Sequence, residues 1–244
     1  MKKIILVLMI AIFGMSYSNG KTVEIVKSYN LNSTTKISLE AKNATIKVIP
    51  TETNKVIIKV QTNEELSLID HLSNNKIVIN IVTPKNSIFS SIFKSKDKKK
   101  SKNKNTFITL EVPQNYHGEL NLLSTNGKIS ASKLSANLSL KTVNGLISLS
   151  NISGNIKAQT TNGNINITDS NSITSIETTN GQIKATSKTL LKGGSVKSTN
   201  GKLDLKVAKL EGDNVISTIN GSINLTTPKD EININIFEKK YFKD

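Results

Sequence analysis

Ser124-Thr125-Asn126-Gly127-Lys128-Ile129 is the stretch that decides the fold, because its pattern of Ser/Thr, any residue, Asn, Gly, any residue and Ile/Leu occurs six times. The Asn residues follow one another at spacings of 18, 18, 18, 20 and 20 residues. A fixed period in this range is typical of repeat proteins, in which each unit buries its apolar face against the next. The six pairs are Asn126-Gly127, Asn144-Gly145, Asn162-Gly163, Asn180-Gly181, Asn200-Gly201 and Asn220-Gly221.

Apolar residues recur at fixed distances from each Asn. The side chains four positions before the Asn, three after it and five after it are apolar in every copy, and the residues between them are mostly polar. This alternation with a period of two residues is typical of β-strands. The sequence therefore predicts that each unit contains a strand, an Asn-Gly corner, a second strand and a looser return.

Two all-β architectures fit this pattern. In a β-solenoid of about 18–20-residue coils, equivalent residues of successive coils stack about 4.8 Å apart. In an antiparallel meander or sandwich, each Asn-Gly pair forms a type I′ hairpin turn. The solenoid is favoured because equivalent positions hold similar residues in all six copies, as expected where each side chain stacks on its own kind.

The Asn-Gly corners are interpreted as structural. A Ser or Thr stands two positions before each Asn, on the inward parity, where its hydroxyl can bond to buried backbone of a neighbouring coil. We expect the Asn side chains to form a ladder along this corner and the Gly residues to turn the corner in the left-handed conformation.

The chain begins with features of a secretory signal peptide. Met1-Lys2-Lys3 is followed by an apolar run from Ile4 to Met15 and by small residues up to Ser18. The apolar run is shorter than the roughly 20 residues that span a membrane, so we expect cleavage near Ser18 rather than an anchor. The sequence thus predicts export to the periplasm, cell surface or medium, with no transmembrane segment in the mature chain. The absence of Cys excludes a disulfide scaffold.

Residues 19–244 are predicted to form a single solenoid domain. Strands are expected at 22–29, 56–60, 76–82 and 107–112, with a polar connection containing His71 between the second and third. Residues 37–48 match the repeat, with Asn43-Ala44 in place of Asn-Gly, and form a degenerate first coil. Residues 228–244 are expected to be a C-terminal cap and tail.

Residues 83–106 interrupt the repeat and are predicted to be a disordered basic loop insertion. Within it, residues 88–104 contain two Phe followed by seven Lys, with Asp97 as the one opposing acid, so residues 88–104 carry +6 of the formal net charge of +15. An alternative function for the segment is contact with a membrane or cell wall, in which Phe enters the interface and Lys meets anionic groups. The candidate contact residues are Phe89, Phe93, Lys94, Lys96, Lys98, Lys99, Lys100, Lys102 and Lys104.

Other chemistry finds little support in the sequence. All 33 basic residues are Lys, and no aromatic platform alternates with them, so no nucleic-acid partner is expected. His71 and His117 lie outside the regular repeats and share no metal-ligand spacing with carboxylates. Neither a catalytic motif nor a cofactor or metal motif is recognisable. Paired carboxylates of a polysaccharide hydrolase or lyase could still meet in space, which leaves an enzyme as the less favoured alternative.

With its Thr-x-Asn-Gly-x-Ile phrases and alternating arms behind a signal peptide, the chain resembles the bacterial exported "putative adhesin" family of unknown function. The resemblance covers residues 35–227, with 83–106 as an insertion. It implies a β-solenoid fold and a non-enzymatic envelope or surface protein, without catalytic residues to carry over. Lys128, Leu146 and Asn164 stand where the family often has an acid, as do Gln182, Lys202 and Ser222, which makes this surface more basic.

Adhesion through a solenoid surface is therefore the expected function. The expected partners are anionic cell-surface polymer, glycan or lipid headgroups. Scattered acids would favour a binding protein, and acids gathered in a groove would favour an enzyme acting on polysaccharide.

Overall fold

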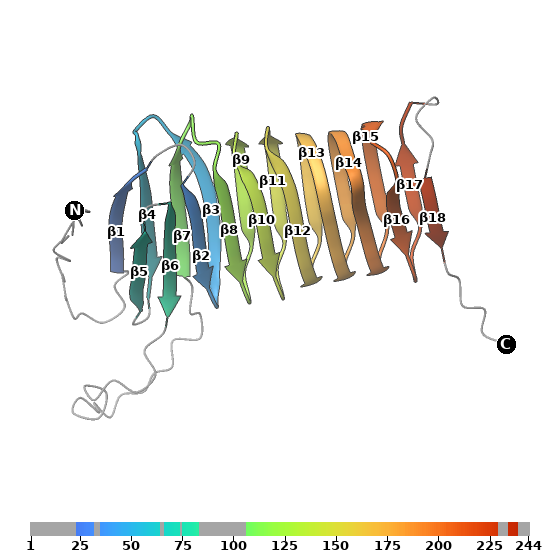
Figure 1. Cartoon of the computed structure of the whole chain (residues 1–244). Coiled ribbons are helices and arrows are strands. Elements are labelled where there is room, and N and C mark those ends of the chain that lie inside the picture. Colours follow the sequence, from blue (N-terminus) through green and yellow to red (C-terminus); the bar gives the residue numbers. More distant parts are fainter. Residues whose placement is uncertain are drawn as a thin grey trace, which may run out of the picture.

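The computed structural model describes residues 23–31, 35–63, 66–73, 75–82 and 106–228, together with the backbone of residues 234–238. All the secondary-structure elements in these ranges are β-strands. The described residues contain no helix that is long and apolar enough to cross a membrane. The strands lie side by side along one long axis, from β1 (Val23–Asn30) to β18 (Ile234–Glu238) at the opposite end (Figure 1). The fold is all-β and forms a β-solenoid, which confirms the predicted fold class.

Each regular coil has two strands joined by an Asn-Gly corner. The strands before the corners are β8 (Glu119–Ser124), β10 (Asn137–Thr142), β12 (Asn155–Asn162) and β16 (Asn214–Thr218). The strands after the corners are β9 (Ile129–Leu134), β11 (Ile147–Ile152), β15 (Leu203–Leu210) and β17 (Ile223–Thr226). β13 (Ile165–Asn180) and β14 (Ile183–Asn200) continue through the return, so each supplies the second strand of one coil and the first strand of the next.

Successive coils pair in parallel and in register. β8 pairs with β10, placing Leu122 opposite Leu140, and β9 pairs with β11, placing Ile129 opposite Ile147. The two strands that flank an Asn-Gly corner thus extend opposite sides of the stack, whereas a type I′ hairpin would pair them with each other in antiparallel fashion. The antiparallel meander is therefore wrong for these coils. The "first side" below means the strands before the corners, and the "second side" means those after them.

The degenerate coil predicted at residues 37–48 is present. β2 (Lys36–Ala41) pairs in parallel with β8, and β3 (Ala44–Thr51) pairs in parallel with β9. One further coil lies on the N-terminal side of it: β6 (Lys76–Val82) pairs with β2, and β7 (Thr106–Pro113) pairs with β3. Ile81 stands opposite Ala41 and Thr106 opposite Ala44, so residues 83–105, which lie outside the described ranges, separate two strands at the register of an Asn-Gly corner.

Antiparallel strands complete the N-terminal end. On the second side, β4 (Lys55–Thr62) pairs with both β7 and β1, and on the first side β5 (Ser67–Ser73) pairs with β6. His71 lies on β5, so the expectation of a polar connection there is wrong: the edge strand pairs with β6 from Ser67 to Ser73. An ion pair of 2.6 Å between Lys27 of β1 and Asp70 of β5 joins the two edge strands.

The core fills the space between the two sides. Apolar side chains of both sides point inward in rows that run the length of the stack, and most are fully buried. Burial of such a continuous core is the main stabilising contribution in repeat proteins. Only the last coil departs, because Ile223 and Leu225 are partly exposed where the equivalent residues of earlier coils are buried. The inward rows are Leu122, Leu140, Ala158, Ile176, Val196 and Ile216; Ile129, Ile147, Ile165, Ile183 and Leu203; and Ala131, Leu149, Ile167, Ala185 and Leu205.

The change of period from 18 to 20 residues is absorbed in the return. Ile173 of β13 stands opposite Leu190 of β14, but the next paired residues are Ser175 and Ser195, so β14 bulges between them. This bulge contains Gly193, which has a φ of 72°. The strands on both sides keep their register through the insertion, as β14 pairs in step with β15 and β16 afterwards.

Candidate functional site

The six Asn residues lie on one line along the stack, with Asn43 at its N-terminal end. The Nδ2 of each Asn donates to the Oδ1 of the Asn one coil before it, at 2.7 or 2.8 Å. Because parallel strands lie about 4.8 Å apart, an amide at the same register position in every coil meets its neighbours without adjustment. The row begins with Asn220 donating to Asn200 and ends with Asn126 donating to Asn43.

The hydroxyl residues two positions before each Asn are buried and bond to the corner of the previous coil. Thr160 donates to the carbonyl oxygen of Gly145 at 3.1 Å, and Thr178 donates to that of Gly163 at 3.0 Å. The same bond recurs from Ser124, Thr142, Ser198 and Thr218. Each hydroxyl thus satisfies a carbonyl at the corner, where no strand ladder reaches it.

The corner Gly residues do not have the left-handed conformation that we expected. The positive-φ Gly residues among the described residues are Gly193 and Gly212, neither of which belongs to an Asn-Gly pair. The corner Gly residues are required by packing instead. A Cβ on Gly163 would lie 2.0 Å from the carbonyl oxygen of Gly145, and one on Gly181 would lie 1.9 Å from that of Gly163. Glycine is needed because backbone stacks directly on backbone.

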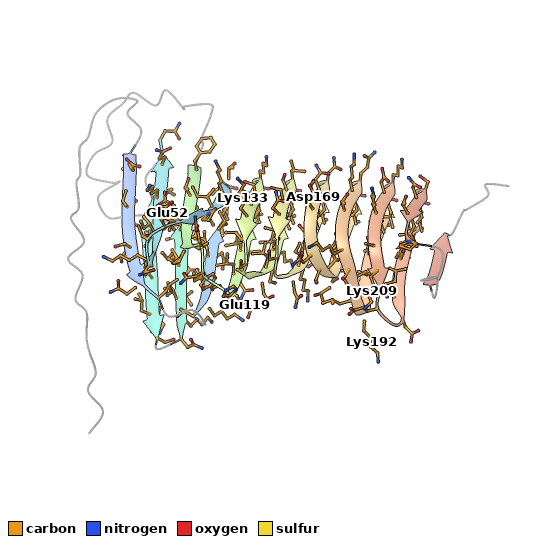
Figure 2. The ribbon with its side chains drawn as sticks, turned by 90° about the horizontal axis from the view of Figure 1, so that it is seen from above. Glu52, Glu119, Lys133, Asp169, Lys192 and Lys209 are labelled. Atoms are coloured by element: carbon orange, nitrogen blue, oxygen red, sulfur yellow. The ribbon has the colours of Figure 1, made fainter. Side chains whose placement is uncertain are left out.

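The left-handed residues lie in the return instead. Lys133, Asn151 and Asp169 have φ values of 56°, 54° and 49° and follow one another at 18-residue intervals. No residue type marks this position, since Lys and Asp share it with Asn. In Figure 2, Lys133 and Asp169 lie toward one long side of the stack, and Lys192 and Lys209 lie toward the other. This second turning point could not be identified from the sequence, because its 18-residue spacing is not accompanied by a recurring residue type.

The outward face of the second side changes from neutral to basic along the stack. In its middle, β9, β11 and the first part of β13 present Ser130, Ser132, Ser148, Ser150, Asn166 and Thr168. Toward the C-terminal end, β14 presents Lys184, β15 presents Lys206, and Lys202 directly precedes β15. We name these three residues the basic patch; all three are exposed. Lys184 stands opposite Asp204, and Lys202 Nζ lies 4.0 Å from an oxygen of that carboxylate.

The acidic residues do not gather at one place. Glu119 pairs with Lys36 at 2.9 Å, Glu211 pairs with Lys209 at 3.2 Å, and Asp204 accepts from Asn224 at 3.1 Å. His71 lies on β5, and His117 is exposed in the turn before β8. Among the described residues, no three of the types His, Cys, Asp and Glu come together as metal ligands would.

The two groups with displaced pKa values serve the fold. Burial raises the pKa of the Tyr116 hydroxyl, with Glu119 as a smaller cause, and this hydroxyl donates to the carbonyl oxygen of Thr35. Burial also raises the pKa of Tyr29, with the charge of Asp70 as the next cause. Both Tyr side chains are held neutral in the N-terminal part of the stack, away from the Asn row and the basic patch.

Two groups of predicted residues lie outside the described ranges. They are the signal peptide, residues 1–18, and the candidate membrane-contact residues from Phe89 to Lys104. The flanking strands show where the second group enters the fold: β6 ends and β7 begins at the register of an Asn-Gly corner, one coil beyond Asn43-Ala44.

The chain is similar to one described family and to several solved structures. The family is Toastrack DUF4097, which matches residues 34–237. A putative cell adhesion protein from Clostridium sporogenes shares 16% identity, with a TM-score of 0.45 over 85% of this chain and 100% of that one. A putative lipid binding protein from Parabacteroides distasonis shares 14% identity, with a TM-score of 0.41 over 88% and 92% of the two chains.

A putative adhesin from Parabacteroides merdae is also similar, with 10% identity and a TM-score of 0.41 over 91% of this chain and 98% of that one. No curated protein matches the chain.

Proposed function

The chain belongs to the Toastrack DUF4097 family, and on that premise we propose that it is a non-enzymatic exported protein that binds an anionic extracellular polymer along its second side. The observation that carries the proposal is the periodic outward face on which rows of Ser, Thr and Asn lead into the basic patch. A polymer has repeating groups, and a solenoid presents repeating groups along a long flat surface. The protein would be located in the cell envelope or the medium.

The charge of this face favours an anionic partner. The basic patch contains one carboxylate, Asp204, which stands opposite Lys184, lies 4.0 Å from Lys202 Nζ and accepts from Asn224. The patch therefore keeps a net positive charge on strands that are fixed by the stack. Hydroxyl and amide groups of the adjoining coils can donate to and accept from sugar hydroxyls, while the Lys residues meet phosphate or carboxylate groups.

The proposal excludes chemical turnover of the polymer. General acid–base cleavage of a glycosidic bond uses two carboxyl groups that flank it, and the acids of the described coils are separated and partly paired with Lys or Asn. We expect polysaccharides such as polygalacturonate to keep their length when incubated with the protein. Release of reducing ends or unsaturated products would contradict this part of the proposal.

Polymer binding is tested with a matched pair of variants. The first replaces the basic patch by Gln at Lys184, Lys202 and Lys206. The second replaces three exposed Lys on the first side by Gln, at Lys141, Lys157 and Lys197, and so removes the same charge. The probes are immobilised teichoic acid, polygalacturonate and uncharged dextran at physiological salt.

We expect the first variant to lose at least about tenfold in affinity for an anionic polymer, since each Lys near an anionic surface contributes about 1 kcal/mol. The second variant should bind nearly as well as the natural chain. Equal losses in both variants would show attraction by net charge alone and would contradict a site on the second side. Binding of neither anionic polymer by the natural chain would also overturn the proposal.

Peripheral attachment through residues 88–104 is a second candidate. It is favoured by the register of β6 and β7, because β6 ends and β7 begins at the level of an Asn-Gly corner. In a liposome-pelleting assay with anionic lipid, the full chain should pellet and a chain lacking residues 83–105 should not. Equal pelleting of both chains, or of neither, would contradict it.

A further inference from the structure

Asn-Gly pairs can undergo a spontaneous covalent reaction. The backbone nitrogen of the Gly attacks the side-chain Cγ of the Asn, the Cγ–Nδ2 bond breaks, and ammonia leaves. Water then opens the resulting succinimide to Asp or isoaspartate. Because Gly has no Cβ to hinder the approach, Asn-Gly is especially prone to this deamidation. Six such pairs lie at the corners of the stack, and all six Asn side chains are exposed to water.

In the interior of the stack, contacts with both neighbouring coils restrain the Asn-Gly pairs from this reaction. The amide of Asn162 donates to Asn144 and accepts from Asn180, at 2.8 Å in each case, so its Cγ cannot turn toward the Gly nitrogen without breaking two bonds. The Gly backbone is confined as well. Gly163 packs against the carbonyl oxygen of Gly145, and Gly181 packs against that of Gly163.

Among the residues that the structure describes, none donates to the amide of Asn220, so the pair Asn220-Gly221 has fewer restraints than the interior pairs. Asn220 donates to Asn200 at 2.7 Å, but the residue twenty positions later is Lys240, so the row of Asn amides ends here. Among the described strands, β17 pairs with β15 alone. Its residues Ile223 and Leu225 are partly exposed, whereas Leu203 and Leu205 one coil earlier are buried.

We propose that Asn220 is a deamidation site at the free end of the Asn row and that deamidation proceeds from this end toward the N-terminus. An Asp at position 220 has no Nδ2 to donate, and its carboxylate faces the Oδ1 of Asn200. Loss of the bond and repulsion between the two oxygens loosen the last coil. Asn200-Gly201 then becomes the exposed end of the row and reacts next.

The first experiment measures the order of reaction. The full chain is incubated in mildly alkaline buffer, and the conversion of each amide to a carboxyl group is followed by mass spectrometry of tryptic peptides. A parallel sample in urea gives the rate of each pair without the fold. The peptides are Asn105–Lys128, Thr142–Lys157, Ala158–Lys184, Ser198–Lys202 and Leu210–Lys229, and fragmentation separates Asn162 from Asn180 in the third and Asn220 from Asn214 and Asn224 in the last.

We expect similar rates for all six pairs in urea. In the folded chain Asn220 should react first, Asn200 only after Asn220, and Asn144 and Asn162 hardly at all. A folded chain in which an interior pair reacts as fast as Asn220 would overturn the proposal.

The second experiment moves the end of the row. Asn220→Asp should raise the rate at Asn200 severalfold, because it removes the donor to Asn200. Ser222→Asp adds the same charge two residues away without touching the row, and it should leave the rate at Asn200 unchanged. An unchanged rate at Asn200 in the Asn220→Asp variant would contradict the sequential part of the proposal, and so would an equal rise in both variants.

Discussion

The Asn-Gly corners and the return segments belong to the same coils but solve the problem of turning the chain in different ways. At the corners, identical residues stack at every level, and side chains and backbone bond from coil to coil. In the returns, Lys133, Asn151 and Asp169 turn the chain by their own backbone conformation, and the length varies between coils. Strict repetition thus marks the place where identical side chains bond at every level, whereas in the return successive coils bond mainly through the backbone, so the residues there can vary.

The largest difference between the two regions is expected from adding one methyl group. Gly163→Ala places a Cβ 2.0 Å from the carbonyl oxygen of Gly145, so backbone must move in a stack fixed on both sides. We expect a loss of about 3 kcal/mol or more in the free energy of unfolding. Gly193→Ala in the return meets nothing within 4 Å, and its φ of 72° should cost only about 1 kcal/mol. Urea denaturation of both variants measures the difference, and equal losses would remove the distinction.

The buried hydroxyls of the corner should give the next largest effect. Thr160→Val keeps the shape of the side chain but leaves the carbonyl oxygen of Gly145 without its donor, which should cost about 1–2 kcal/mol. Thr161→Val is the control, because Thr161 is exposed and points away from the core. Its denaturation midpoint should stay close to that of the natural chain. Equal midpoints in the two variants would show that the buried bond contributes nothing.

The exposed amides should matter less than the buried hydroxyls. Asn162→Ala removes one bond to Asn144 and one from Asn180, and because water can replace both, we expect a loss of about 1 kcal/mol. Asn166→Ala removes an exposed amide of the second side, four residues away, and should change the midpoint little. If Asn162→Ala proved as neutral as Asn166→Ala, the row would be a consequence of stacking rather than a source of stability.

The smallest effect is expected in the return and has the opposite sign. Lys133 is exposed and has a φ of 56°, a conformation that glycine adopts without strain. Lys133→Gly should raise the unfolding free energy by about 0.5 kcal/mol, the relief of strain being partly offset by the greater freedom of glycine in the unfolded chain. A clear loss of stability would show that the Lys133 side chain has a role that the geometry does not reveal.

The same contrast explains how much of the fold could be predicted from the sequence. The inward rows and the parallel stack follow from alternation and period, since every coil repeats them. The positions of Asn43-Ala44 and of β7 also followed from the pattern. The role of the corner Gly did not, because a requirement for a left-handed conformation and a requirement for close backbone packing select the same residue. The left-handed residues of the return could not be found, as Lys, Asn and Asp occupy equivalent positions.

The N-terminal end and the binding surface were harder to predict. The antiparallel pairing of β4 with β7 joins strands far apart in the chain, which periodicity does not encode, and β5 pairs with the next strand, β6, although its own apolar and polar residues do not alternate. The basic patch is formed by Lys residues of two successive coils, so it emerges only when the coils are stacked. Among the predicted site residues, the structure places the corner residues on one line and does not describe those from Phe89 to Lys104.

Disulfide formation tests most directly the claim that successive coils stack in register. The chain has no Cys, so introduced pairs have no competitors. Ser148 and Asn166 stand opposite each other on β11 and β13, about 4.8 Å apart as neighbouring strands are, within the range of a disulfide. Ser148 and Lys184 lie two coils apart, beyond the limit of about 7 Å. Under mild oxidation, Ser148→Cys with Asn166→Cys should cross-link quantitatively and Ser148→Cys with Lys184→Cys should not. Failure of the first pair, or equal cross-linking of both, would contradict the stack.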